Sequence, residues 1–141
     1  MGGKTRKGGK RAVMAQTKEQ KAIKKIVKKT VENMTALGTY RAQFAAAIQN
    51  YAEMRYQLSE LNAQFYAGGC KITEMYTNKA GATNERKTAL YMAIETLRRD
   101  IAATEDRLGL TPSGMKRIND REMKSRKRES KLDRALKSSG K

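Results

Sequence analysis

The positive charge of this 141-residue chain is confined to its two ends, and this distribution limits how the chain can fold. Residues 1–29 carry eleven lysines and arginines against one acidic residue, and residues 116–141 carry eleven against four. Residues 30–115 hold nine residues of each sign, so this middle section is neutral. A neutral section can pack and self-associate without charge repulsion, whereas the basic ends stay solvated and are free to bind a polyanion.

The composition excludes several classes of protein. The chain has a formal net charge of +17, contains no His and has a single Cys. The absence of His removes the commonest general base and the commonest metal ligand, and one Cys cannot form an internal disulfide or a thiolate zinc site. No apolar run is long enough to cross a membrane. We therefore expect a protein without metal or cofactor that works in a reducing cytoplasm.

Three short motifs that resemble catalytic sites lack the context that catalysis needs. The segment GGKT at residues 2–5 lacks the earlier glycine and the strand of a phosphate-binding loop. Ser113 and Lys116 have the spacing of a serine acyl-enzyme, but no Ser-Asp-Asn or Lys-Thr-Gly follows them. Cys70 has no His partner, so we expect a small buried thiol rather than a nucleophile. The sequence predicts no enzymatic activity.

Residues 17–37 have the pattern of an amphipathic helix. Thr17 and Gln20 form a capping box at its start, and Gly38 supplies a stop at its end. At about 100° per residue, the apolar residues fall on one side and six lysines fall within roughly 140° on the other. These are Lys18, Lys21, Lys24, Lys25, Lys28 and Lys29. Surface helices usually mix charges of both signs, so this face favours an anionic partner over simple solvation.

A second helix is predicted over residues 40–67, with Thr39 as its N-cap and the glycine pair at 68–69 at its end. Residues 70–83 break the helical pattern. They are compatible with a short strand or a hairpin, and the sequence leaves these two alternatives open.

A third helix is predicted at about 85–108, with Asn84 as its N-cap. Its apolar residues, together with Thr104, recur at alternating spacings of four and three, which is typical of the seam of an antiparallel hairpin or a coiled coil. We assign five seam residues to an oligomer interface: Leu90, Ile94, Leu97, Ile101 and Leu108.

A fourth helix is predicted at about 112–121, with Thr111 as N-cap and Pro112 at the first helical position. Beyond Arg121 the chain is basic, permits a helix and is poorly amphipathic. We expect this last part to become ordered only with a partner.

These elements predict an all-α fold: a helical hairpin core with a short extended or hairpin insertion and basic flexible termini, assembling into a ring. Residues 1–15 form a disordered basic arm, residues 16–118 the helical core and residues 119–141 a basic C-terminal segment. So small a core has more apolar surface than one hairpin can cover, so we expect a homo-oligomer with cyclic symmetry.

The lopsided charge most often marks a nucleic-acid partner. We assign the phosphate contacts to the six lysines of residues 17–37 and to five basic residues of the arm. The arm residues are Lys4, Arg6, Lys7, Lys10 and Arg11.

The segment LGLTPS at residues 108–113 follows the long third helix. Together with the Met-x-x-Leu step at 34–37, the glycine pair at 68–69 and Asn84, it resembles a family of bacteriophage terminase small subunits over about residues 34–118. The resemblance implies a helical, ring-forming protein without a catalytic site. Such a protein binds double-stranded viral DNA in the host cytoplasm and hands it to a large subunit that carries the ATPase and the nuclease.

Two other functions remain open. A general basic nucleic-acid-binding protein of the ribosomal or nucleoid type needs only the charge distribution. A membrane-surface or peptide-binding module would use residues 17–37 as a basic amphipathic helix. The seam over residues 90–108 disfavours the first, because such a protein has little need of a neutral, self-associating hairpin. The lack of Trp and Phe opposite the lysines disfavours the second.

Overall fold

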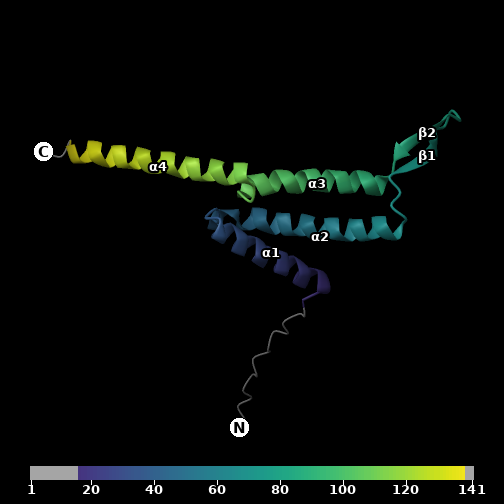
Figure 1. Cartoon of the computed structure of the whole chain (residues 1–141), viewed down its shortest axis with the longest axis horizontal. Coiled ribbons are helices and arrows are strands. Elements are labelled where there is room, and N and C mark those ends of the chain that lie inside the picture. The colour runs from purple at the N-terminus through teal and green to yellow at the C-terminus, as the bar shows by residue number, and fades with distance from the viewer. Residues whose placement is uncertain (1–15, 139–141) are drawn as a thin grey trace, which may run out of the picture.

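The computed structural model describes residues 16–138. This part of the chain contains helices α1 (Lys18–Ala36), α2 (Ala45–Ala67), α3 (Ala89–Leu108) and α4 (Pro112–Ser138), a short 3-10 turn η1 (Ala42–Phe44), and strands β1 (Thr73–Thr77) and β2 (Thr83–Lys87). Helices α2 and α3 lie side by side as an antiparallel hairpin, and α1 packs against α2 (Figure 1). Helix α4 runs on past the body from the end of α3, and the strands project from the opposite end (Figure 1). The predicted all-α fold with a hairpin insertion is confirmed.

The two ends of α1 are set by local sequence, as predicted. The Thr17 hydroxyl accepts a hydrogen bond from the Gln20 N–H (3.2 Å), and the Gln20 side chain accepts one from the Thr17 N–H (3.1 Å). Gly38 follows the C-cap with φ of 72°, a left-handed conformation that glycine adopts without strain. Both interactions involve residues within one turn, so tertiary packing does not change them.

Thr39 does not cap α2, which corrects the prediction. Its side chain is fully buried, and its hydroxyl donates to the Met34 carbonyl (3.4 Å). Helix α2 begins only at Ala45, after η1, and neither element has a side-chain cap. Thr39 is drawn inward because the turn after α3 packs directly on it: a Cβ placed on Gly109 would lie 2.8 Å from Thr39 Cγ2.

Asn84 does not cap α3 either. It lies in β2 opposite Tyr76, and the strand continues to Lys87. Thr88 takes the capping role, since its hydroxyl accepts from the Tyr91 N–H (3.2 Å). The pairing of β2 with β1 therefore delays the start of α3.

The insertion is an antiparallel hairpin, which decides between the two alternatives left open for residues 70–83. Its register pairs Thr73 with Lys87 and Thr77 with Thr83, and the Asn78 side chain accepts from two backbone N–H groups in the turn. All residues of both strands are exposed. A two-stranded sheet without cover is marginally stable alone, so the hairpin depends on its attachment to α3.

The core lies where α1, α2 and α3 meet. Its buried cluster consists of Met34, Ile48, Tyr51, Ile101 and Leu108. The seam of α3 faces α2, as the spacing of four and three predicts for a helical hairpin. The Tyr51 hydroxyl donates to Glu105 (2.7 Å), and burial together with this carboxylate raises the pKa of Tyr51 to about 12.

The connection between α3 and α4, here named the elbow (residues 106–117), is held by one carboxylate. Asp106 accepts hydrogen bonds from the Thr111 hydroxyl (2.8 Å), the Ser113 hydroxyl (2.7 Å) and the Arg117 guanidinium (2.6 Å). The Ser113, Arg117 and Thr111 donors lower the pKa of Asp106 to about 2. The predicted N-cap is confirmed as well, because the Thr111 hydroxyl accepts from the Gly114 N–H (3.1 Å).

Two glycines allow the helices to approach each other closely at the elbow. A Cβ on Gly114 would lie 2.0 Å from the Asp106 carbonyl oxygen, inside any possible contact distance. Gly109 has φ of 72°, and a Cβ there would lie 2.7 Å from Ile118 Cδ1. The backbone path between α3 and α4 therefore requires glycine at both positions.

Helix α4 continues to Ser138, well past Arg121, where the sequence-based prediction ends the helix. Residues 115–138 contain neither Gly nor Pro, so nothing in the backbone stops the helix. An ion pair between the Arg41 guanidinium and Glu122 attaches this helix to the junction of α1 and α2.

The close approach at Gly114 generates a first prediction. Gly114→Ala should destabilise the fold by about 3 kcal/mol, because the added methyl group overlaps a backbone oxygen and cannot be relieved by a rotamer change. Ser125→Ala, at an exposed position of the same helix, should cause little change. Chemical denaturation of both variants measures the difference. Equal stability of the Gly114 variant and the wild type would contradict the described path of the elbow.

The Asp106 network generates a second prediction. Its folded pKa lies below the ordinary value of 3.8, so its contribution to stability is present above about pH 4 and is lost as the pH falls toward 2. Asp106→Asn should therefore lower the Tm at neutral pH, and the difference from the wild type should shrink between pH 4 and pH 2. Asp120→Asn, an exposed carboxylate on α4, is the matched control and should show no such convergence. A pH-independent difference for Asp106→Asn would count against the network.

Candidate nucleic-acid interface

The six lysines of α1 form an uninterrupted exposed surface, here named the α1 lysine face: Lys18, Lys21, Lys24, Lys25, Lys28 and Lys29. The opposite side of the helix packs on the body, where Val27 and Val31 contact the core cluster and Met34 is fully buried. The contact side therefore fixes the helix, and the lysine side is left to solvent or a ligand.

Acidic residues compensate this face only weakly. Lys28 Nζ lies 3.9 Å from Glu32, and the two side chains are 80% and 62% exposed, so the pair contributes little in water. Glu19 lies outside the lysine arc, in the first turn. The Thr17 hydroxyl, with a smaller contribution from the charge of Lys18, lowers the pKa of Glu19. The face keeps most of its positive potential.

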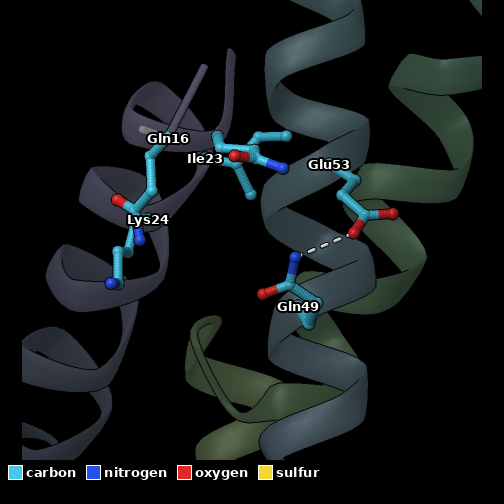
Figure 2. Close-up of a pocket in the computed structure, with 6 residues that line it drawn as sticks. Gln16, Ile23, Lys24, Gln49 and Glu53 are labelled. Atoms are coloured by element: carbon cyan, nitrogen blue, oxygen red, sulfur yellow. Dashed lines mark hydrogen bonds between the residues drawn. The ribbon is translucent and has the colours of Figure 1, made fainter. Parts of the chain in front are cut away.

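A polar hollow of about 430 Å³ lies between the start of α1 and α2 (Figure 2). Ile23 and Lys24 line it from α1, together with Gln16 and Gln20 at the start of that helix. On the α2 side the Gln49 amide donates to Glu53 (2.8 Å), as the dashed line in Figure 2 shows. Amides, one carboxylate and one ammonium group supply hydrogen bonds but no nucleophile paired with a base. The hollow is therefore a polar groove at the border of the α1 lysine face.

The remaining predicted phosphate-binding residues, Lys4, Arg6, Lys7, Lys10 and Arg11, lie outside the described residues, as does the arm over 1–15 to which they belong.

The predicted interface residues on α3 separate into two groups. Ile94, Ile101 and Leu108 are 1%, 4% and 2% exposed within a single chain, so their side chains already pack inside the hairpin. Leu90 and Leu97 are only partly buried. A second copy of the chain can therefore reach Leu90 and Leu97 but not the other three.

The C-terminal segment, which the sequence predicts to be basic and poorly amphipathic, forms a second basic surface on α4. At about 100° per residue, eight basic side chains fall within roughly 140° of this helix, and all eight are exposed. This α4 basic face consists of Lys116, Arg117, Arg121, Lys124, Lys127, Arg128, Lys131 and Arg134. The available signal was a seven-residue recurrence, as in Arg117, Lys124 and Lys131, which places residues on one side of a helix. The segment beyond Arg121 is thus amphipathic in charge, although it is poor in apolar residues.

The opposite side of α4 contacts the body. Met115 and Ile118 are partly buried, and Glu122 binds Arg41. Helix α1 is attached along one side and α4 through its first three turns, and both present basic side chains on the side away from these contacts.

The described residues were predicted to hold neither a metal site nor a reactive cysteine. Between residues 16 and 138, no group of three His, Cys, Asp or Glu side chains could hold a metal ion. Cys70 is exposed, which corrects the expectation of a buried thiol, because the turn after α2 gives it a left-handed φ of 57° and directs the chain away from the core. Within the same range, no helix is both long and apolar enough to cross a membrane.

A family model described as "Phage terminase, small subunit" matches residues 23–125. No curated protein and no solved structure matches the chain. The matched range begins within α1, ends within α4 and includes the hairpin and the elbow.

Proposed function

Because this chain belongs to the phage terminase small subunit family, which supports a role in phage genome packaging, we propose that it is the DNA-binding component of a packaging terminase. In this proposal it binds double-stranded viral DNA in the host cytoplasm as a homo-oligomeric ring. It then recruits or regulates a large subunit, which carries the ATPase and the nuclease. The observation that carries the proposal is the α1 lysine face, exposed on a helix whose other side is fixed to the body.

The chemistry of the α1 lysine face suits the DNA backbone. Lysine ammonium groups bind phosphates as point charges, whereas base edges are generally read by Arg, Asn or Gln side chains held in a fixed geometry. The face contains no arginine. We therefore expect modest sequence specificity per subunit, with several subunits adding their contacts.

Exposed apolar side chains support the oligomer in this proposal. Large apolar groups remain exposed at the hairpin end of the body, at Tyr66, Ile72, Met75, Tyr76 and Met92. Together with the partly buried Leu90 and Leu97, they supply apolar surface that further copies of the chain could cover. In this arrangement Ile94, Ile101 and Leu108 hold the hairpin that presents the interface.

The absence of catalysis in this proposal is consistent with the surroundings of Glu85, Glu95 and Asp100, the first two of which have structural partners. Glu95 accepts both of its bonds from Lys87 (2.8 Å each), and Glu85 accepts from Thr73 (2.6 Å). Asp100 is exposed on α3. These groups serve as surface and hairpin contacts, and the ATPase and nuclease are assigned to the large subunit.

DNA binding by the α1 lysine face is the third prediction. Lys21→Gln with Lys25→Gln should lower the slope of log K against log salt by about 2, because each phosphate that a lysine neutralises contributes about 0.9 to the slope. The measurement is fluorescence anisotropy of a labelled duplex titrated between about 50 and 200 mM salt. Gln preserves helix propensity and length, so the weaker binding reports charge rather than folding.

The matched control removes two charges elsewhere. Lys71→Gln with Lys79→Gln changes exposed residues at the base and tip of the hairpin and should leave the slope nearly unchanged. If both pairs weaken binding equally, net charge rather than the α1 lysine face governs affinity, and the assignment fails.

The oligomer interface gives the fourth prediction. Leu97→Asp should reduce the mass measured by size-exclusion chromatography with light scattering toward that of one chain (15.8 kDa) while helical circular dichroism is retained, because Leu97 is only partly buried. Ile101→Asp should instead unfold the chain, since it places a charge in the core. A wild-type mass of 15.8 kDa at micromolar concentration, or an unchanged oligomer in the Leu97 variant, would refute this interface.

A further inference from the structure

We propose that the α4 basic face is a second nucleic-acid-binding surface, which holds DNA phosphates at a place separate from α1. This inference rests on the proposed function, because it assigns the same class of ligand to a different part of the chain. Nothing in the family match assigns a role to this face.

The α4 basic face is long enough to contact several phosphates of a DNA duplex. Its first and last members, Lys116 and Arg134, are eighteen residues apart, so the face is about 27 Å long at 1.5 Å per residue. Duplex DNA carries one phosphate charge per ~1.7 Å of axis, so a face of this length can contact several phosphates at once. Asp120 is the single acidic residue within the arc.

The elbow holds the start of the α4 basic face in place. The Asp106 carboxylate binds the hydroxyl of Thr111, directly before α4, and two donors in the first turns of α4, and Arg41 binds Glu122 about one turn further on. Every side chain described after Glu122 is exposed. A helix attached at one end and unsupported along the rest presents its basic residues without cover from the body.

Arginine distinguishes this face from the α1 lysine face. Four of its eight residues are arginines, namely Arg117, Arg121, Arg128 and Arg134. Guanidinium groups bind phosphate oxygens through two parallel hydrogen bonds, so each contact is more directional than a lysine contact. Arg117 is already bound to Asp106, which leaves seven side chains of the face for the ligand.

The other side of α4 argues against a membrane surface as the ligand. A membrane-bound helix needs a continuous apolar side. On α4 that side is interrupted by Glu122 and Ser125 between Ile118 and Leu132, and by Asp133 directly after Leu132. The composition fits a charged ligand that contacts the basic arc alone.

The two basic surfaces lie on different parts of the molecule. Helix α1 packs against α2, whereas α4 leaves the body at the elbow and extends past it (Figure 1). Their contributions to binding should therefore be independent, because residues this far apart share no contacts.

The test is the fifth prediction and uses three matched pairs of substitutions in the full chain. Lys124→Gln with Lys131→Gln should lower the salt slope by about 2 and the affinity at about 0.1 M salt by more than roughly tenfold. Combined with Lys21→Gln and Lys25→Gln, the slope should fall by about 4 in total. Lys71→Gln with Lys79→Gln remains the control for net charge, and circular dichroism and light scattering should show unchanged helix content and mass for all variants.

The outcomes separate this inference from the proposed function. If the α1 pair weakens binding and the α4 pair does not, the inference is overturned while the proposed function stands. If the wild-type protein binds no duplex at any salt concentration, both fail. If the α4 pair leaves DNA binding intact but weakens capture by the purified large subunit, the face belongs to an acidic protein surface, and the inference is again overturned.

Discussion

The arrangement of this protein depends on the contact between the end of α3 and the start of α4. There the Asp106 carboxylate gathers three donors, and Gly114 lets the helix backbones meet where any side chain would overlap. Because the same turn buries Thr39, it also fixes the junction between α1 and α2. The elbow therefore sets the direction of α4 and packs on the residue that follows α1, whereas α1 itself is held by its apolar contacts with the core.

Separation of charge explains how so basic a chain can fold. The neutral middle supplies α2, α3 and the hairpin, which pack or pair without repulsion. Helix α1 attaches along one side and α4 through its first turns, and both leave their basic side chains in water. This division keeps the lysines in water and buries the apolar sides of the helices. Both are needed, because burying lysines without partners is costly and exposing the apolar sides would lose the stabilisation that the core provides.

Local interactions account for what the sequence predicted well. The Thr17 capping box, the left-handed Gly38 and the Thr111 cap each involve residues within one turn, so their geometry follows from the residues themselves. The predictions that Thr39 and Asn84 cap helices were wrong because each residue contacts a part of the chain outside its own helix. The elbow buries Thr39, and β1 pairs with Asn84. The same local sequence can form a helix cap or part of a strand, and only pairing with a second strand decides which of the two forms.

The sequence by itself determined the helical class, the α2–α3 seam, the absence of histidine chemistry and the confinement of charge to the ends, because these depend on composition and periodicity. The tertiary structure decided which seam residues stay accessible, where α3 begins and how far α4 extends from the body. It also placed most basic residues of the last segment on one side of a helix. The physical reason is that accessibility and direction arise from contacts between residues far apart in the chain, such as Arg41 with Glu122, which no local pattern encodes.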